Sequence, residues 1–111
     1  MFEKNLQLSF LIDFYAGLLT DRQQRMLDLY YNQDLSLGEI AEDIGISRQG
    51  VRDSLKKAER ELYFFEERLH LAARDSAVRE AGARLMPHLA TEAARDAASA
   101  LISAALGEGD L

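Results

Sequence analysis

Apolar residues recur along most of the chain at spacings of three and four positions, which is the period of an amphipathic α-helix. No stretch sustains the alternation of apolar and polar residues that marks a β-strand, and β-branched residues are scarce. The single proline, Pro87, lies late in the sequence. The pattern therefore predicts an all-α protein.

The first predicted helix covers residues 3–16 and ends at Gly17, a helix stop signal. One apolar stripe along it consists of Leu6, Phe10 and Phe14. A helix that is apolar on more than one side is usually buried on more than one side, so we expect this helix to lie inside the fold. Its other sides are covered by Leu8, Leu11, Ile12 and Tyr15.

Two helices with matched start signals follow. One begins at Thr20, which has Gln23 at the capping-box spacing, and ends at residues 32–34. The other begins at Ser36, which has Glu39 in the same relation, and stops at Gly45. The residues predicted to face inward are Met26, Leu27, Leu29, Tyr30 and Tyr31 in the first helix, and Leu37, Ile40, Ala41 and Ile44 in the second.

A long helix is predicted to start after Ser47, its N-cap. Its apolar residues alternate at spacings of four and three, as in a coiled coil: Val51, Leu55, Ala58, Leu62, Phe65, Leu69 and Ala72. Tyr63 and Phe64 project away from this seam and need another surface to cover them. The exposed apolar area favours a homodimer, and intramolecular packing by the helices that follow is the alternative.

The composition becomes Ala-rich from Asp75 onward, with two further helices divided near residues 87–91. The last residues, 107–111, read as a frayed tail. We therefore divide the chain into residues 1–74, a helix-turn-helix domain, and residues 75–111, an Ala-rich helical extension.

The helix-turn-helix prediction depends on four positions in the segment LSLGEIAEDIGISRQGVRDSLKKAERE, Leu35 to Glu61. Ala41 is small where two helices cross, and Gly45 suits the tight turn between them. Ile46 fills the core behind the turn, and Ser47 caps the next helix. Short helix, glycine turn and capped helix form the motif whose second helix enters the major groove of DNA. The alternative is a helical hairpin that only packs.

Charge is distributed unevenly along this chain of 111 residues and net charge -6. Residues 47–60 carry five bases against two acids, whereas residues 1–46 and 61–111 are both acidic. Like charges four residues apart on a helix repel each other, so a row of them is explained by an anionic partner such as nucleic acid. The row is Arg48, Arg52, Lys56 and Arg60. The alternative is a solvated face, partly neutralised by Asp53–Lys57 and Lys56–Glu59 pairs.

The candidate DNA-contacting residues fall into two groups. The first turn of the long helix should reach base edges, with arginine suited to guanine and glutamine to adenine. The base-edge candidates are Ser47, Arg48, Gln49 and Arg52. The phosphate candidates are Ser36, Lys56, Lys57 and Arg60, with Arg22 a weaker one.

Other classes of protein receive no support. The chain has no cysteine, and His70 and His88 lack the spacing of metal ligands. No nucleophile–base pair or phosphate-cradling glycine loop is present, so we expect neither an enzyme nor a cofactor. The absence of a signal peptide and of an apolar run long enough to span a membrane predicts a soluble, cytoplasmic protein without membrane insertion.

Two segments carry a resemblance to known families. The segment LTDRQQRMLDLYYNQDLSLGEIAEDIGISRQGVRDSLKKAERELYFFEERL resembles region four of sigma-70-type transcription factors. Together with the N-terminal MFEKNLQLSFLIDFYAGLLTDRQ, it resembles the bacterial YlxM family, small helix-turn-helix proteins whose genes lie beside that of the signal recognition particle GTPase. The resemblance covers about residues 1–72 and is most specific over residues 18–55.

This resemblance implies a cytoplasmic, all-helical, sigma-region-four-like protein, often dimeric, with an accessory role in the signal recognition particle pathway. Two functions follow as hypotheses. One is a DNA-binding regulator, and the other is a protein or ribonucleoprotein accessory module that acts on particle components. The DNA sequence, the choice between DNA and RNA, and the sign of any regulation stay open.

Overall fold

The computed structural model describes residues 6–108, and all the regular structure in this part of the chain is helical, which confirms the predicted all-α class. The chain separates into two compact units, Met1–His70 and Leu71–Leu111.

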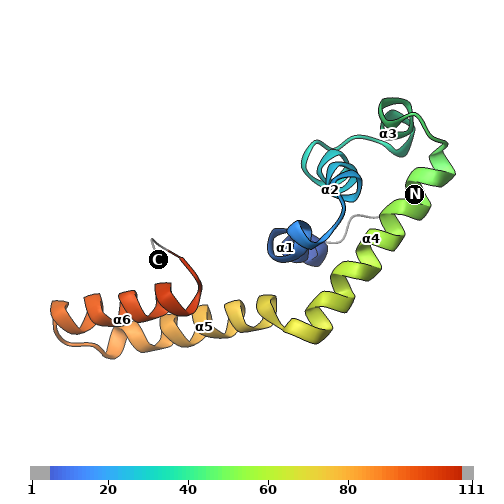
Figure 1. Cartoon of the computed structure of the whole chain (residues 1–111). Helices are drawn as coiled ribbons and strands as arrows, with labels where there is room; N and C mark the ends of the chain where they lie inside the picture. The colour runs from blue at the N-terminus through green and yellow to red at the C-terminus, as the bar shows by residue number, and fades with distance from the viewer. Residues whose placement is uncertain (1–5, 109–111) are drawn as a thin grey trace. The chain divides into compact units, whose positions relative to one another are not determined.

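The first unit is built on one long helix. The helix α4 (Arg48–Leu69) packs against α1 (Leu6–Tyr15), α2 (Asp21–Leu27) and α3 (Leu37–Ile44), which lie along one side of it (Figure 1). Two short helices complete the unit: the 3-10 helix η1 (Ala16–Leu18) and the π-helix η2 (Asp28–Asn32), which continues α2.

The core of this unit draws side chains from all four α-helices. The buried face predicted for the second helix is confirmed at Met26, Leu27, Leu29 and Tyr30. The first helix was predicted to be buried on more than one side, and this is wrong for the side that carries Phe10: α1 buries Leu8, Leu11 and Tyr15, whereas Phe10 is 65% exposed. The remaining buried side chains are Leu19, Ile40, Ala41, Val51, Leu55, Ala58 and Leu62.

Capping side chains fix where α2 and α3 begin. The Thr20 hydroxyl accepts from the N–H of Gln23 at 3.1 Å, and the Gln23 side chain accepts from the N–H of Thr20 in return. Ser36 and Glu39 make the same pair of bonds at the start of α3. Both predicted capping boxes are therefore confirmed.

The first α-helix ends at Tyr15, close to the predicted end, but not through the left-handed glycine stop expected at Gly17. The chain continues past α1 into η1, and Gly17 does not adopt the left-handed conformation, whereas Gly45 does with φ of 86°. Leu19 closes the 3-10 turn by donating its N–H to the carbonyl of Ala16 at 3.0 Å. A 3-10 turn of this kind supplies hydrogen-bond donors to the free carbonyl groups at the end of a helix, so no left-handed residue is needed.

The apolar seam of the long helix ends earlier than predicted. His70 takes a left-handed conformation with φ of 57° and terminates α4, so Ala72 belongs to the next helix. Burial along the seam extends only to Leu62, and Leu69 is 45% exposed. Because α1, α2 and α3 are short, they cover only part of α4.

The second unit is a pair of helices, α5 (Leu71–Leu85) and α6 (Glu92–Ala105), joined through the 3-10 helix η3 (Met86–His88). The predicted division near residues 87–91 is confirmed, and Thr91 caps α6 by accepting from the N–H of Ala94. The helices approach closely at Gly82, where a Cβ atom would lie 2.7 Å from Cδ1 of Ile102.

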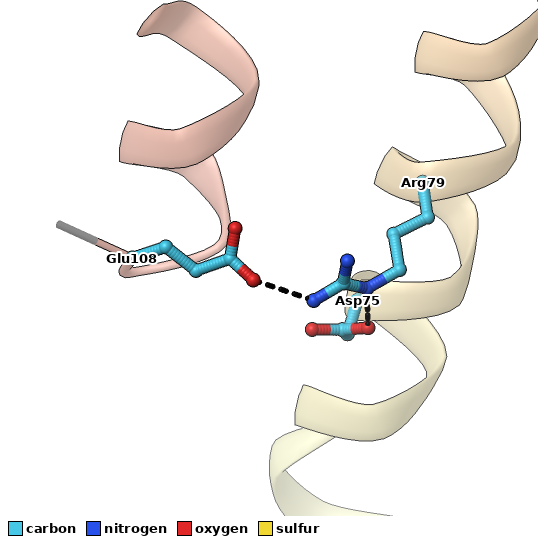
Figure 2. Close-up of polar contacts among 3 residues, drawn as sticks. All are labelled: Asp75, Arg79 and Glu108. Carbon is cyan, nitrogen blue, oxygen red and sulfur yellow. Dashed lines mark hydrogen bonds and ion pairs between the residues drawn. The ribbon is translucent and has the colours of Figure 1, made fainter. Parts of the chain in front are cut away.

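An ion-pair cluster joins α5 to the segment that follows α6. Arg79 of α5 donates to the carboxylates of Asp75 and Glu108, each at 2.7 Å (Figure 2). These two carboxylates raise the pKa of the Arg79 guanidinium, Asp75 being the larger cause. A shallow groove of about 400 Å³ lies beside the cluster and is lined mainly by Gly82, Met86, Ile102 and Leu106.

Candidate nucleic-acid interface

The helix-turn-helix prediction is confirmed in the segment from α3 to α4. The turn closes because the N–H groups of Gly45 and Ile46 both donate to the carbonyl of Ala41, at 2.9 and 3.1 Å. Gly45 is left-handed, and Ser47 then caps α4 by accepting from the N–H of Gly50 at 2.9 Å. Ala41, Val51 and Leu55 are buried where the two helices meet.

The first turn of α4 carries positive charge without an acid to balance it. No acidic residue lies in this turn, in contrast to α2 with Asp21 and α3 with Glu39. The N-terminus of a helix already has a partial positive charge from its free N–H groups. Arg48 and the helix end therefore both attract an anion.

Arg48 reaches from α4 back to α3. A Cβ atom on Gly38, in the first turn of α3, would lie 3.0 Å from Nε and 3.1 Å from Nη2 of Arg48. Glycine at position 38 thus leaves the space that the Arg48 guanidinium occupies. The guanidinium therefore lies beside Gly38 in the first turn of α3. Gly38 is two residues after the phosphate candidate Ser36.

Arg52 is only half-exposed, and its Nε is buried without a hydrogen-bond acceptor in the described part of the chain. A half-buried guanidinium without a carboxylate keeps a desolvation cost that is not offset locally. Arg52 therefore lies on the flank of α4 with unused hydrogen-bonding capacity.

The bases farther along α4 are exposed and unpaired within the described residues. Lys56, Lys57 and Arg60 are exposed. Across residues 6–108, the ion pairs join Arg25 to Asp43 and Arg79 to Asp75 and Glu108, and none involves a base of residues 47–60.

Four of the five acids of α4 accept hydrogen bonds from uncharged donors. Asp53 accepts from Nε2 of Gln49 at 2.9 Å, and Glu59 accepts from the Tyr31 hydroxyl at 2.7 Å. Within residues 6–108, neither an Asp53–Lys57 nor a Lys56–Glu59 ion pair is formed. Two more acids link α4 to the helices beside it: Glu61 accepts from Gln23 and Glu66 from Tyr15.

Ser36 has a charged neighbour. Its hydroxyl accepts from the N–H of Glu39, whose carboxylate accepts from the N–H of Ser36. The backbone bond and then the hydroxyl lower the pKa of the Glu39 carboxyl, so this group stays negative at the start of α3. A phosphate at Ser36 would have to displace this carboxylate or share the helix end with it. Arg22, the weaker candidate, is exposed on α2.

Two features of this face escaped the sequence analysis. The first is the space that Gly38 leaves for Arg48, which depends on the packing of α3 against α4. The sequence held one signal of it, because glycine inside a helix is unfavourable and its presence there suggests a packing requirement. The Gln49–Asp53 hydrogen bond joins residues four apart on one helix, a spacing that was visible in the sequence.

Neither a cluster of metal ligands nor a membrane-spanning helix is present among the described residues. Within residues 6–108, no group of three or more His, Asp or Glu side chains is arranged to hold a metal ion. No helix in the same range is both long and apolar enough to cross a bilayer.

The short helix, left-handed glycine turn and capped long helix define a helix-turn-helix protein. The chain belongs to the family described as "UPF0122: Putative helix-turn-helix protein, YlxM / p13 like", whose sequence model matches residues 2–100.

Relatives in several bacteria share this similarity. A UPF0122 protein of Shouchella clausii is 38% identical over 102 residues, which make up 92% of this chain and 94% of that protein. One from Halalkalibacterium halodurans is 47% identical over 74 residues, 67% of this chain and 68% of that protein. A third, from a Thermoanaerobacter species, is 55% identical over 69 residues, 62% of this chain and only 59% of the relative's length.

Proposed function

We propose that this protein is a DNA-binding regulator that inserts the first turns of α4 into the major groove. The observation that carries the proposal is the set of bases on α4 that have no acidic partner within residues 6–108. They lie on the second helix of a helix-turn-helix, the helix that this motif presents to DNA.

The distribution of charge along the chain supports a DNA contact that is confined to residues 47–60. A net charge of -6 repels a polyanion from most of the surface. The excess of bases over acids in residues 47–60 therefore selects both the site and the orientation of the bound duplex. A single basic face favours a regulator that binds DNA in one defined orientation over a protein that coats nucleic acid nonspecifically.

Each candidate residue has a role in this proposal. Arg48 and Arg52 donate to guanine, Gln49 pairs with adenine, and Ser47 contacts a base or phosphate at the start of the helix. Lys56, Lys57 and Arg60 bind phosphates and set the register of the protein on the duplex. Ser36 adds a hydroxyl contact to the flanking strand.

Binding to a fluorescent duplex of random sequence tests the proposal. We expect Lys56→Glu/Arg60→Glu in the full chain to weaken binding about tenfold or more and to reduce the salt dependence, because phosphate contacts are lost. The matched control is Arg74→Glu/Arg84→Glu, which makes the same change in charge at exposed positions of α5. Equal losses in both variants, or no duplex binding by the wild type, would reject the DNA-binding face.

A second candidate function is an accessory role on the signal recognition particle. It is favoured by exposed apolar residues in unit one, among them Phe10, Leu18 and Phe64, and by the resemblance to the YlxM family. We infer that this surface contacts a component of the particle, and a pull-down with the particle's GTPase and RNA tests it. Absence of enrichment over an unrelated helical protein would remove this candidate.

A homodimer in the cytoplasm completes the proposal. Tyr63 and Phe64 are 41% and 52% exposed on α4, and Arg68 lies over the Phe64 ring at 5.2 Å. Aromatic residues exposed beside an arginine are typical of the centre of a protein interface. Light scattering of the wild type and of Phe64→Ser tests the dimer. A wild type that stays monomeric at micromolar concentration would contradict it.

A further inference from the structure

One carboxylate lies among the bases on the outward face of α4. Gln49, Asp53, Lys56 and Arg60 follow one another at spacings of four, three and four. Helical periodicity places them on the side of α4 opposite the buried residues Val51, Leu55, Ala58 and Leu62. An acid in this position repels phosphate, so its presence on a DNA-binding face needs a reason of its own.

Asp53 forms no ion pair with its basic neighbours within residues 6–108, although Arg52 and Lys57 are close in sequence. Its contact is with an uncharged group, the Nε2 of Gln49 at 2.9 Å. Both side chains are exposed, so the bond is not required to satisfy a buried group.

The chemistry of the two groups fixes the orientation of the amide. An ionised carboxylate only accepts hydrogen bonds, so it can hold the NH₂ end of Gln49 but not the carbonyl oxygen. A glutamine without such a neighbour can turn its amide over and exchange donor for acceptor. Asp53 therefore removes one of the two orientations.

The amide held in this way has one N–H and its carbonyl oxygen left for a ligand. Adenine presents a complementary pair in the major groove, the N7 acceptor and the N6 amino donor. The amide contacts both atoms at once, whereas guanine offers two acceptors there and would face the carbonyl oxygen with its own O6.

We propose that Asp53 is a positioning residue that orients Gln49 to read adenine and, through its charge, weakens binding to duplexes without adenine at that position. The inference rests on the proposed function, since it assumes that α4 enters the major groove. It assigns to Asp53 a part in sequence discrimination with no contact to DNA of its own.

Selection from a pool of randomised duplexes, followed by affinity measurement on single-base variants of the selected site, tests the proposal with full-length proteins. We expect the wild type to prefer adenine at one position by about five- to 150-fold, the range for a bidentate base contact. Asp53→Ala should lower the preference for adenine over guanine at least twofold, because the released amide can turn its NH₂ group toward guanine O6, while it tightens binding to duplexes that lack the adenine. Gln49→Ala should abolish the preference. Asp53→Glu keeps a carboxylate within reach and should retain the preference.

The double variant Gln49→Ala/Asp53→Ala should discriminate no worse than Gln49→Ala alone, because Asp53 acts through the amide. Retention of the full adenine preference by Asp53→Ala overturns the proposal. Loss of a cytosine preference instead would mean that Asp53 reads a base directly, which also overturns it. Tight binding by the wild type without sequence preference rejects this inference alone, whereas the absence of duplex binding rejects the proposed function as well.

Discussion

Two glycines of the helix-turn-helix are needed for different physical reasons. Gly45 has φ of 86° and no atom within 4 Å of where a Cβ would lie, so its requirement is conformational. Gly38 has ordinary helical backbone, but a Cβ there would crowd the Arg48 guanidinium at 3.0 to 3.2 Å. Substitutions at the two positions should therefore affect different properties.

Gly45→Ala should lower the free energy of unfolding by about 1 kcal/mol, because an L-residue in the left-handed region is strained. Gly17→Ala is the matched control, since Gly17 also has open space around its Cα but no positive φ. We expect the control to change stability by less than about 0.5 kcal/mol in urea denaturation. Equal effects of the two substitutions would contradict a conformational role for Gly45.

Gly38→Ala should leave stability unchanged or raise it by up to about 1 kcal/mol, because alanine favours the helix. The added methyl group displaces the flexible end of Arg48 rather than the backbone. If Arg48 contacts DNA, affinity in a fluorescence titration should fall by roughly two- to fivefold, part of one charged contact. In an Arg48→Ala background the same substitution should have no further effect, and a loss there would indicate another cause.

At the scale of the elements, the starts of α2, α3 and α4 were predictable from a few residues. Thr20, Ser36 and Ser47 cap their helices as expected, because capping is a local interaction over three residues. The end of α4 was not predictable, since its seam pattern continues beyond Leu69. The left-handed turn at His70 and the limited coverage by α1, α2 and α3 depend on the tertiary structure.

The candidate interface was predictable to a similar degree. The base-rich segment of α4 is visible in the sequence, and the bases lie on the helix that the motif offers to DNA. Sequence spacing alone suggested that Glu59 pairs with Lys56. In the fold, the Tyr31 hydroxyl of η2 donates a hydrogen bond to the Glu59 carboxylate instead. Which partner an acid takes is decided by the neighbouring helix, which the spacing along α4 does not reveal.

The Tyr31–Glu59 contact between η2 and α4 predicts a dependence of stability on alkaline pH. Burial of the hydroxyl, and then the Glu59 carboxylate, raise the pKa of Tyr31 above its ordinary value of 10.0. Above about pH 10 the unfolded chain loses this proton while the folded chain retains it. Unfolding then becomes easier as pH rises, by at most about 1.4 kcal/mol per pH unit, and no such slope is expected below about pH 10.

Tyr31→Phe isolates this contribution. At neutral pH the variant should be less stable by about 1 kcal/mol, the usual cost of one lost hydrogen bond. In urea denaturation from about pH 8 to about pH 11, the difference between wild type and variant should shrink above about pH 10, because only the wild type has the tyrosine proton to lose. Parallel curves through this range would show that Tyr31 does not control the slope.

At the scale of the whole molecule, the two units differ in how they bury apolar side chains. Met1–His70 has a core of large side chains that includes Tyr15, Met26, Ile40 and Leu62. In the described part of Leu71–Leu111, Gly82 alone is buried, and apolar residues of α5 and α6 remain at least partly exposed. Burial of apolar surface is the main source of folding free energy, so the first unit carries most of the stability.

Fragments 1–70 and 71–111 test this division. Fragment 1–70 should unfold in one cooperative transition close to that of the full chain when followed by circular dichroism, because its core is complete. Fragment 71–111 should lose its helical signal gradually, since isolated helices of 15 and 14 residues are marginal in water without a core. A gradual loss that sharpens as the concentration is raised would mean that α5 and α6 complete their core with a second copy. A sharp transition independent of concentration would contradict the prediction, because the Gly82–Ile102 contact and the Arg79 cluster would then be enough to hold two helices together.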